Sequence, residues 1–216
     1  MKNLIYLVVV FLFSCGGSQD NSKISEQDTS VTPNIDTNEV AIEEVQSFRS
    51  IEDIKKGYAS VVQKMDKGLL DSLSFKYNCD NERSGTVTYY SENSKVVSIA
   101  HRYAEYDHHS AVDQYFLQDD KLYFAFLNTT YWSFQSGAAA EGATKDDITE
   151  QRIYLIDNTA VECLEKKYTI LSEASNNPVP ATVPNKKIKC KPVKPLLDKF
   201  QMILNFKGKS DKSCLN

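Results

Sequence analysis

The sequence groups its metal-ligating side chains in one short segment. All 3 histidines lie between positions 101 and 109. The segment carries His101, Arg102, Glu105, Asp107, His108 and His109, and Asp113 lies nearby. Two imidazoles and a carboxylate are suitable ligands for zinc or copper, so His101, Asp107 and His108 are the predicted metal site. His108 and His109 point apart in extended backbone, so only one of them can join His101. A solvated hairpin loop is the alternative interpretation.

A hydrolase would need a different arrangement of the same residue types. Ser110, Asp113 and one of the histidines would form a triad, but triad partners normally come from separate segments of a chain. The sequence has no GxSxG motif and no glycine-rich loop of the phosphate-binding kind. Nothing around Glu105 and Asp107 assigns one of them the role of acid and the other the role of base. We therefore predict that the protein is not an enzyme and uses no cofactor.

Aromatic side chains suggest a second kind of site. Tyr131 and Trp132 precede a small, polar stretch, and Tyr103 and Tyr106 flank the histidine segment. If one sheet face is uncovered, these four residues would form a binding surface for a protein, a glycan or a lipid chain. Ordinary packing of aromatic side chains across neighbouring strands is the alternative.

Three copies of one pattern are expected to position these residues. Each copy runs from an aromatic residue into a turn pair and then into an apolar strand; the pairs are Asn93-Ser94, Asp119-Asp120 and Asp157-Asn158. Asn and Asp tolerate the positive φ of tight hairpin turns. The pattern predicts six strands in three consecutive hairpins, at residues 85–91, 95–102, 111–117, 121–128, 150–156 and 159–166. Residues 133–147 are predicted to be a loop.

A helix is predicted at each end of this strand region. Ser50 and Asp53 have the spacing of a capping box, and apolar residues then recur at helical spacing from Ile51 to Leu69. Near the C-terminus, Pro195 suits a first helical turn, and Gly208 suits the position just after a helix. The predicted fold class is α+β: an antiparallel β-meander of about six strands, flanked by an N-terminal and a C-terminal helix that cover one face.

The beginning of the chain has the features of an export signal. Lys2 precedes an apolar run at residues 4–13, which is short for a bilayer span and suits a signal peptide. Leu12-Phe13-Ser14-Cys15 looks like a bacterial lipobox, so we predict a signal peptide at 1–14 and lipid attachment at Cys15. A signal peptide cleaved elsewhere, which would give a soluble secreted protein, is the alternative.

The segment that follows is predicted to be a tether. Residues 15–46 are acidic and contain no aromatic side chain, so they cannot bury enough apolar surface to fold. We expect a disordered link between the membrane and a single domain at 47–216.

Within that domain the lysines cluster at Lys186, Lys187, Lys189, Lys191 and Lys194, where they form a solvated basic edge or meet anionic groups. Basic and aromatic residues do not interleave as in nucleic-acid-binding proteins, so nucleic acid is rejected as a partner.

Four further cysteines remain once Cys15 is assigned to lipid: Cys79, Cys163, Cys190 and Cys214. An even number in an exported chain predicts two disulfides, for which three pairings are possible. The layout of the chain favours Cys163 with Cys190 and Cys79 with Cys214. Free thiols are the alternative if the protein meets no oxidant.

A family resemblance can be stated on several segments together. They are the lipobox, the acidic tether, the hairpin with Tyr89-Tyr90, Gln114-Tyr115-Phe116 before Lys121-Leu122-Tyr123-Phe124, and Arg152-Ile153-Tyr154 before Val161-Glu162-Cys163-Leu164. Together these segments resemble a group of uncharacterised bacterial lipoproteins, over roughly residue 47 to the C-terminus. The resemblance implies a location in the cell envelope and brings no assigned activity and no functional residue with it.

These observations lead to one expected function and one alternative. We expect a membrane-anchored envelope lipoprotein, at the outer rather than the inner membrane, that faces the periplasm or the cell surface. Its domain is expected to be a non-catalytic binding or interaction module for a protein or small ligand. The alternative is a metal-binding or metal-handling protein that uses the loop from His101 to His109.

Overall fold

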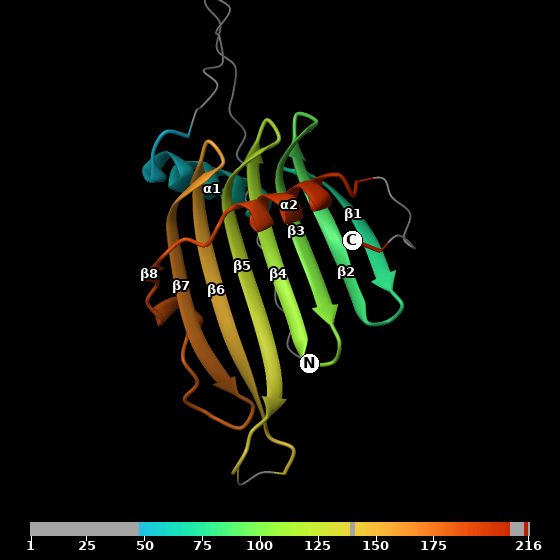
Figure 1. Ribbon diagram of the computed structural model, residues 1–216, viewed down its shortest axis with the longest axis vertical. Helices are drawn as coiled ribbons and strands as arrows, with labels where there is room; N and C mark the ends of the chain where they lie inside the picture. Colours follow the sequence, from blue (N-terminus) through green and yellow to red (C-terminus); the bar gives the residue numbers. More distant parts are fainter. Residues whose placement is uncertain (1–47, 139–140, 208–213, 216) are drawn as a thin grey trace, which may run out of the picture. The chain divides into compact units, whose positions relative to one another are not determined.

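A computed structural model describes residues 48–138, 141–207 and 214–215, and its helices and strands belong to one unit of the chain (Figure 1). In chain order the elements are α1 (Ile51–Asp66), β1 (Asp71–Cys79), β2 (Arg83–Glu92), β3 (Lys95–Glu105), β4 (His109–Gln118), β5 (Lys121–Phe134), β6 (Thr144–Ile156), β7 (Thr159–Leu171), a 3₁₀ turn (Pro180–Thr182), β8 (Lys186–Ile188) and α2 (Lys194–Leu204). The predicted signal peptide (1–14), Cys15, the tether (15–46) and Gly208 lie outside the described residues.

The described strands form one antiparallel sheet in which each strand pairs with its neighbours in the sequence, from β1 to β8. The prediction of an α+β fold with an antiparallel meander is therefore confirmed. The predicted number of strands, about six, is too low, because β1 and β8 were missed. Both missing strands lie at the edges of the sheet, beyond the three predicted hairpins.

The three predicted hairpins share one geometry. Both residues of every predicted turn pair have positive φ, for example 49° at Asn93 and 66° at Ser94. Each hairpin also has a register shift a few residues before its turn, at Tyr90/Ser91, Phe116/Leu117 and Tyr154/Leu155. A bulge of this kind adds one residue to one strand and increases the local twist. The repeated sequence pattern thus specifies a repeated bulge as well as a repeated turn.

The two helices cover opposite faces of the sheet. On β4, the ring of Tyr115 packs against Phe200 of α2, whereas the ring of the next residue, Phe116, packs against Tyr58 of α1. Successive residues of a strand point to opposite faces, so α1 and α2 cannot share one. Figure 1 shows α2 crossing in front of the central strands. The prediction that both helices cover one face is wrong, because the central strands carry large apolar side chains at both alternating sets of positions.

Strand β1 was missed because its sequence is largely polar and its side chains are mostly exposed. Its inward residues, Leu73, Phe75 and Tyr77, alternate with Ser, Lys and Asn, and only Tyr77 is fully buried. The turn into β2 has positive φ at Asp80 (53°) and Asn81 (64°), as in the other hairpins. This turn pair was the available sequence signal for the strand.

The predicted loop at 133–147 is shorter in the structure, because strands extend into it from both ends. β5 continues to Phe134, and β6 begins at Thr144, so only residues 135–143 connect them. The ladder between β5 and β6 pairs Trp132 with Asp146 and Phe134 with Thr144. Backbone pairing extends these strands beyond the core, and their polar side chains gave no apolar alternation to reveal it.

Both predicted helices are present, with different ends. Ser50 caps α1, because its hydroxyl oxygen accepts a hydrogen bond from the Asp53 amide. The helix ends at Asp66, so Leu69 lies beyond it and is 66% exposed. Gly68, with φ of 65°, supplies the left-handed conformation that often follows a helix. Pro195 lies in the first turn of α2, as predicted.

Two disulfides join C-terminal segments of the described domain to its sheet. They link Cys79 on β1 to Cys214, and Cys163 on β7 to Cys190 between β8 and α2. This is the pairing that the chain layout favoured. The sulfur atoms of the second pair hold the segment that leads into α2 against the edge of the sheet.

We predict that Gly85→Ala destabilises the domain by about 1–3 kcal/mol, because an added methyl group would overpack the sheet. A Cβ atom at Gly85 on β2 would lie 2.6 Å from the Arg102 carbonyl oxygen and 2.7 Å from the Tyr77 hydroxyl oxygen. Urea-induced unfolding measures the change in free energy. Ser84→Ala, at the exposed neighbouring position, is the control and should change stability by less than about 0.5 kcal/mol. Equal stability of both variants would contradict the close approach at Gly85.

Candidate functional site

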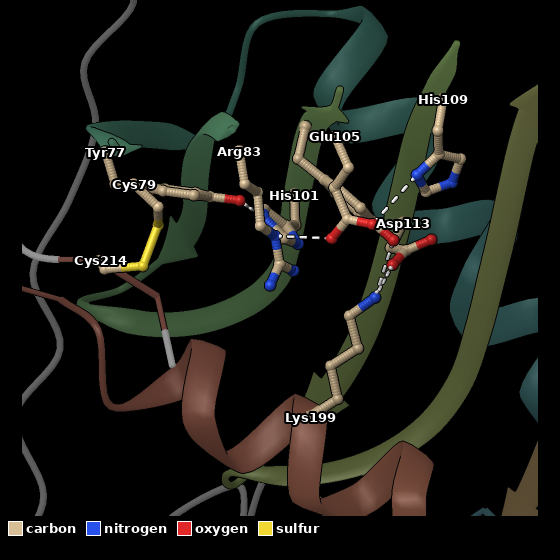
Figure 2. A network of polar contacts seen from close by, with 10 residues as sticks. Tyr77, Cys79, Arg83, His101, Glu105, His109, Asp113, Lys199 and Cys214 are labelled. Carbon is tan, nitrogen blue, oxygen red and sulfur yellow. Dashed lines mark hydrogen bonds and ion pairs between the residues drawn. A yellow bond between two sulfur atoms is a disulfide. The ribbon is translucent and has the colours of Figure 1, made fainter. Parts of the chain in front are cut away.

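A polar network lies between α2 and strands β3 and β4 (Figure 2). Lys199 of α2 places its Nζ atom 2.7 Å from Asp113 Oδ2 on β4 and 3.0 Å from the Tyr103 hydroxyl oxygen on β3. The Asp113 side chain is only 4% exposed, so its charge needs a partner. Burial acts to lower the pKa of Lys199, but the charge and hydrogen bond of Asp113 outweigh burial and raise it. Lys199 therefore remains protonated and balances the charge of Asp113.

His101 lies fully buried beside this ion pair. Its ring stacks on Tyr103 with centroids 4.5 Å apart, and its Nε2 atom lies 2.8 Å from the Tyr77 hydroxyl oxygen. Burial, together with repulsion from Lys199 and Arg83, lowers the pKa of His101 to about 3. The imidazole is therefore neutral at physiological pH. Among the described residues, its buried Nδ1 atom has no hydrogen-bond partner.

Glu105, at the end of β3, forms the outer part of the network. One carboxylate oxygen lies 2.9 Å from Arg83 Nε, and the other lies 3.2 Å from His109 Nδ1. The Arg83 contact is an ion pair only, because its Nε–H is not directed at the oxygen as a hydrogen bond requires. The His109 ring stacks on Tyr131, with centroids 4.6 Å apart. The network therefore connects strands β2 to β5 with α2.

In the inner part of the network, around Lys199 and Asp113, the side chains balance one another's charges. Burial and the nearby Asp113 carboxylate raise the pKa of the Tyr103 and Tyr115 hydroxyls, which stay protonated. With Lys199 protonated and His101 neutral, these groups do not form an activated nucleophile beside a base. The physical effect of the network is to hold α2 at a defined position on the sheet.

The three predicted metal ligands do not come together. His101 is buried on β3, about 13 Å of strand before the turn that carries Asp107 and His108, at ~3.3 Å per residue. His108 instead stacks on Trp132, with centroids 4.1 Å apart, and the Asp107 carbonyl oxygen accepts a hydrogen bond from the Trp132 indole. Within the part of the chain that the structure describes, no three His, Cys, Asp or Glu side chains form a group that could hold a metal ion.

The four aromatic residues of the predicted binding surface are also divided. Tyr103 and Tyr131 lie on the face of α2, where Tyr103 packs under Lys199 and Tyr131 is 56% exposed. Trp132 is adjacent to Tyr131 on β5 and therefore points to the opposite face. Tyr106 lies in the turn after β3 and is 73% exposed. These residues thus do not form a continuous aromatic surface.

A feature that the sequence did not reveal is an apolar cleft beside α2. It encloses about 400 Å³ and is lined by Leu127, Gln151, Ile153, Ala160, Cys163, Leu164, Ile188, Lys191, Pro192, Val193, Pro195, Leu196 and Lys199. Strands β5 to β8 contribute the first seven of these residues. The segment before α2 and the first turns of α2 contribute the others. The cleft is therefore a gap between the sheet and the N-terminal half of α2.

The polar network and one disulfide adjoin this cleft. Lys199 belongs to both, because it lines the cleft and pairs with Asp113. Cys163 lines the cleft through β7, and its disulfide to Cys190 fixes the segment that carries Lys191 and Pro192. The available sequence signal was Pro192 and Pro195, which mark the start of the helix, but they do not show which part of the sheet the preceding segment crosses.

No protein-family model, curated protein or solved structure matches the chain. Among the described residues, neither α1 nor α2 is long and apolar enough to cross a membrane.

We predict that acid destabilises the folded domain through His101. The pKa of His101 is about 3 in the folded domain and 6.5 in an ordinary setting, so between these values the unfolded chain binds a proton that the folded domain does not. The part of the unfolding free energy that depends on neutral His101 is fully present above pH 6.5. Below that pH it falls by about 1.4 kcal/mol per pH unit.

The experiment compares urea-induced unfolding of the wild-type protein and His101→Gln from about pH 6 to about pH 4. The difference between their unfolding free energies should shift by about 1.4 kcal/mol per pH unit, in favour of the variant as the pH falls. Tyr77→Phe removes the hydrogen bond and retains the imidazole, so it should keep the wild-type dependence on pH. Parallel curves for the wild type and His101→Gln would exclude this role of His101.

Proposed function

We propose that the protein is a lipid-anchored, non-catalytic binding module of the bacterial cell envelope, and that its ligand occupies the cleft beside α2. The observation that carries this proposal is the cleft itself. Its volume of about 400 Å³ lies in the range of small-molecule sites, roughly 300–1,000 Å³. Its lining is mostly apolar with a few polar groups, as such sites usually are.

The location is supported by the leader and by the cysteines. Lys2, the apolar run and Cys15 have the order of a lipoprotein signal peptide. The two disulfides of the domain suit an oxidising compartment outside the cytoplasm. We place the protein at the outer membrane, where the acidic segment after Cys15 serves as the tether.

The packing of α2 supports a cleft that exists before the ligand arrives. Lys199 bonds to Asp113 and Tyr103, and the Tyr89 hydroxyl donates a 2.6 Å hydrogen bond to the Ile203 carbonyl oxygen near the end of the helix. Phe200 and Ile203 are buried against the sheet. A wall held in this way loses little conformational entropy when a ligand binds.

We predict that Cys15 carries the lipid. Cells that express the tagged protein and are fed an alkyne-bearing palmitate should incorporate the label into the wild-type protein and not into Cys15→Ser. The labelled wild-type protein should fractionate with the outer membrane. Labelling that persists in Cys15→Ser would contradict lipid attachment at this residue.

We predict that the cleft binds an uncharged apolar probe, N-phenyl-1-naphthylamine, at one site. The experiment uses the full mature chain with Ser at position 15, exported behind a leader that ordinary signal peptidase cleaves. Ala160→Phe places a ring in the cleft and should weaken binding of the probe by roughly tenfold or more. Fluorescence titration gives the dissociation constants.

The matched control is Thr159→Phe, which adds the same ring at the exposed neighbouring position outside the cleft lining. This variant should bind the probe like the wild-type chain. Failure of the folded wild-type chain to bind the probe saturably, or equal binding by both phenylalanine variants, would refute the cleft as the ligand site.

A further inference from the structure

We infer that the ligand of the cleft is a long-chain carboxylate, with its alkyl chain between α2 and the sheet and its head group at Lys191. This inference rests on the proposed function of the cleft and adds the chemical class of the ligand to it.

The lining defines a site for an alkyl chain. Leu127 and Ile153 form part of its sheet side, and Leu196 faces them from α2. Burial of an alkyl chain against such side chains gains free energy in proportion to the apolar area removed from water. A volume of about 400 Å³ is near the lower end for small-molecule sites, which favours a single chain over a lipid with two chains.

The charges of the lining have one sign. Lys191 and Lys199 line the cleft, whereas no Asp or Glu is among its lining residues. The charge of Lys199 is balanced by Asp113, whose carboxylate lies 2.7 Å away. Lys191 is exposed and lies near Glu165, but Glu165 also interacts with Lys167 at 3.1 Å and with Gln151 at 2.8 Å. Lys191 is therefore the cation that is available to a ligand.

The residues next to Lys191 add positive charge near the cleft. The segment between residues 186 and 194 contains five lysines and no acidic residue. Two of these lysines have acidic partners, since Lys187 pairs with Glu162 and Lys194 pairs with Asp198. An excess of positive charge beside an apolar cleft complements an anionic head group on an apolar chain.

The charge of the available cation favours a carboxylate over a phosphate. No arginine lines the cleft, so neither head group would be held by a bidentate guanidinium contact. Lys191 supplies a single positive charge on a flexible stem, which suits a head group with one negative charge.

The experiment measures displacement of N-phenyl-1-naphthylamine from the full mature chain with Ser at position 15. The competitors are dodecanoate, 1-dodecanol and dodecyl phosphate, which share one chain length and differ in the head group. Dodecanoate should displace the probe at a concentration roughly tenfold lower than dodecanol, as expected for a hydrogen bond to a charged group. This preference should decrease as the salt concentration rises.

The variant that tests the head-group contact is Lys191→Gln, which should abolish the preference for dodecanoate over dodecanol when each competitor is compared with the variant's own affinity for the uncharged probe. Lys76→Gln is the matched control, because Lys76 is an exposed lysine on β1, at the opposite edge of the sheet. It should retain the wild-type preference.

Each other outcome identifies which proposal fails. If dodecanoate and dodecanol displace the probe equally, and Ala160→Phe still weakens probe binding, the ligand is not a carboxylate. The cleft then remains a binding site. Tighter binding of dodecyl phosphate would replace the carboxylate with a phosphate ligand. Absence of probe binding by the folded chain would instead refute the proposed function itself.

Discussion

The ion pair between Lys199 and Asp113 is the interaction on which the arrangement of the α2 face depends. Asp113 lies on a central strand with its side chain 4% exposed, so its carboxylate is tolerable only because a cation reaches it from the helix above. The same lysine bonds to Tyr103, whose ring covers the buried imidazole of His101. Removing Lys199 would leave the Asp113 carboxylate buried without a cation, which costs more than the pair contributes when intact. The pair thus specifies where α2 lies more than it adds to stability, and the position of α2 in turn defines the cleft.

Much of the meander could be predicted from local patterns, since hairpin turns and helix caps depend on neighbouring residues. The pairs Asn93-Ser94, Asp119-Asp120 and Asp157-Asn158 identify three hairpins because few residue types accept positive φ. Ser50 identifies the start of α1 for a similar reason. The extensions of β5 and β6 could not be predicted in this way, because backbone ladders hold them with little apolar alternation in their side chains. Strand β1 is also polar, and only its turn pair, Asp80-Asn81, indicated it. The bulges make the facing of side chains harder to predict, because each one shifts the alternation by one residue and a single period of two then fails along the strand.

The candidate site was harder to predict, because its contacts join residues that are far apart in the sequence. Lys199 and Asp113 are separated by 86 positions, and Tyr77 and His101 by 24. The cluster of histidines between 101 and 109 suggested a shared site, yet strand geometry separates them. His101 is directed into the core, whereas His108 lies in the turn and packs against Trp132. Closeness in the sequence is therefore a poor guide in a sheet, where the neighbours of a side chain belong to adjacent strands. Predicting the cleft would also have required the path of residues 189–193 across the edge of the sheet.

The path of residues 189–193 relates the proposed location of the protein to its proposed ligand site, because a disulfide fixes it. The disulfide between Cys163 and Cys190 closes a loop of 27 residues and holds the segment with Lys191 beside β7. In the chain-entropy account, closing a loop of this length stabilises the folded state by roughly 3–4 kcal/mol. Oxidation also limits the movement of one wall of the cleft, which lowers the entropy that a ligand must offset on binding. In a reducing compartment this segment would lose that covalent link and depend on non-covalent contacts such as the three residue pairs between β7 and β8 and the docking of α2. The disulfide that suits an oxidising compartment would thus also keep the proposed cleft preformed.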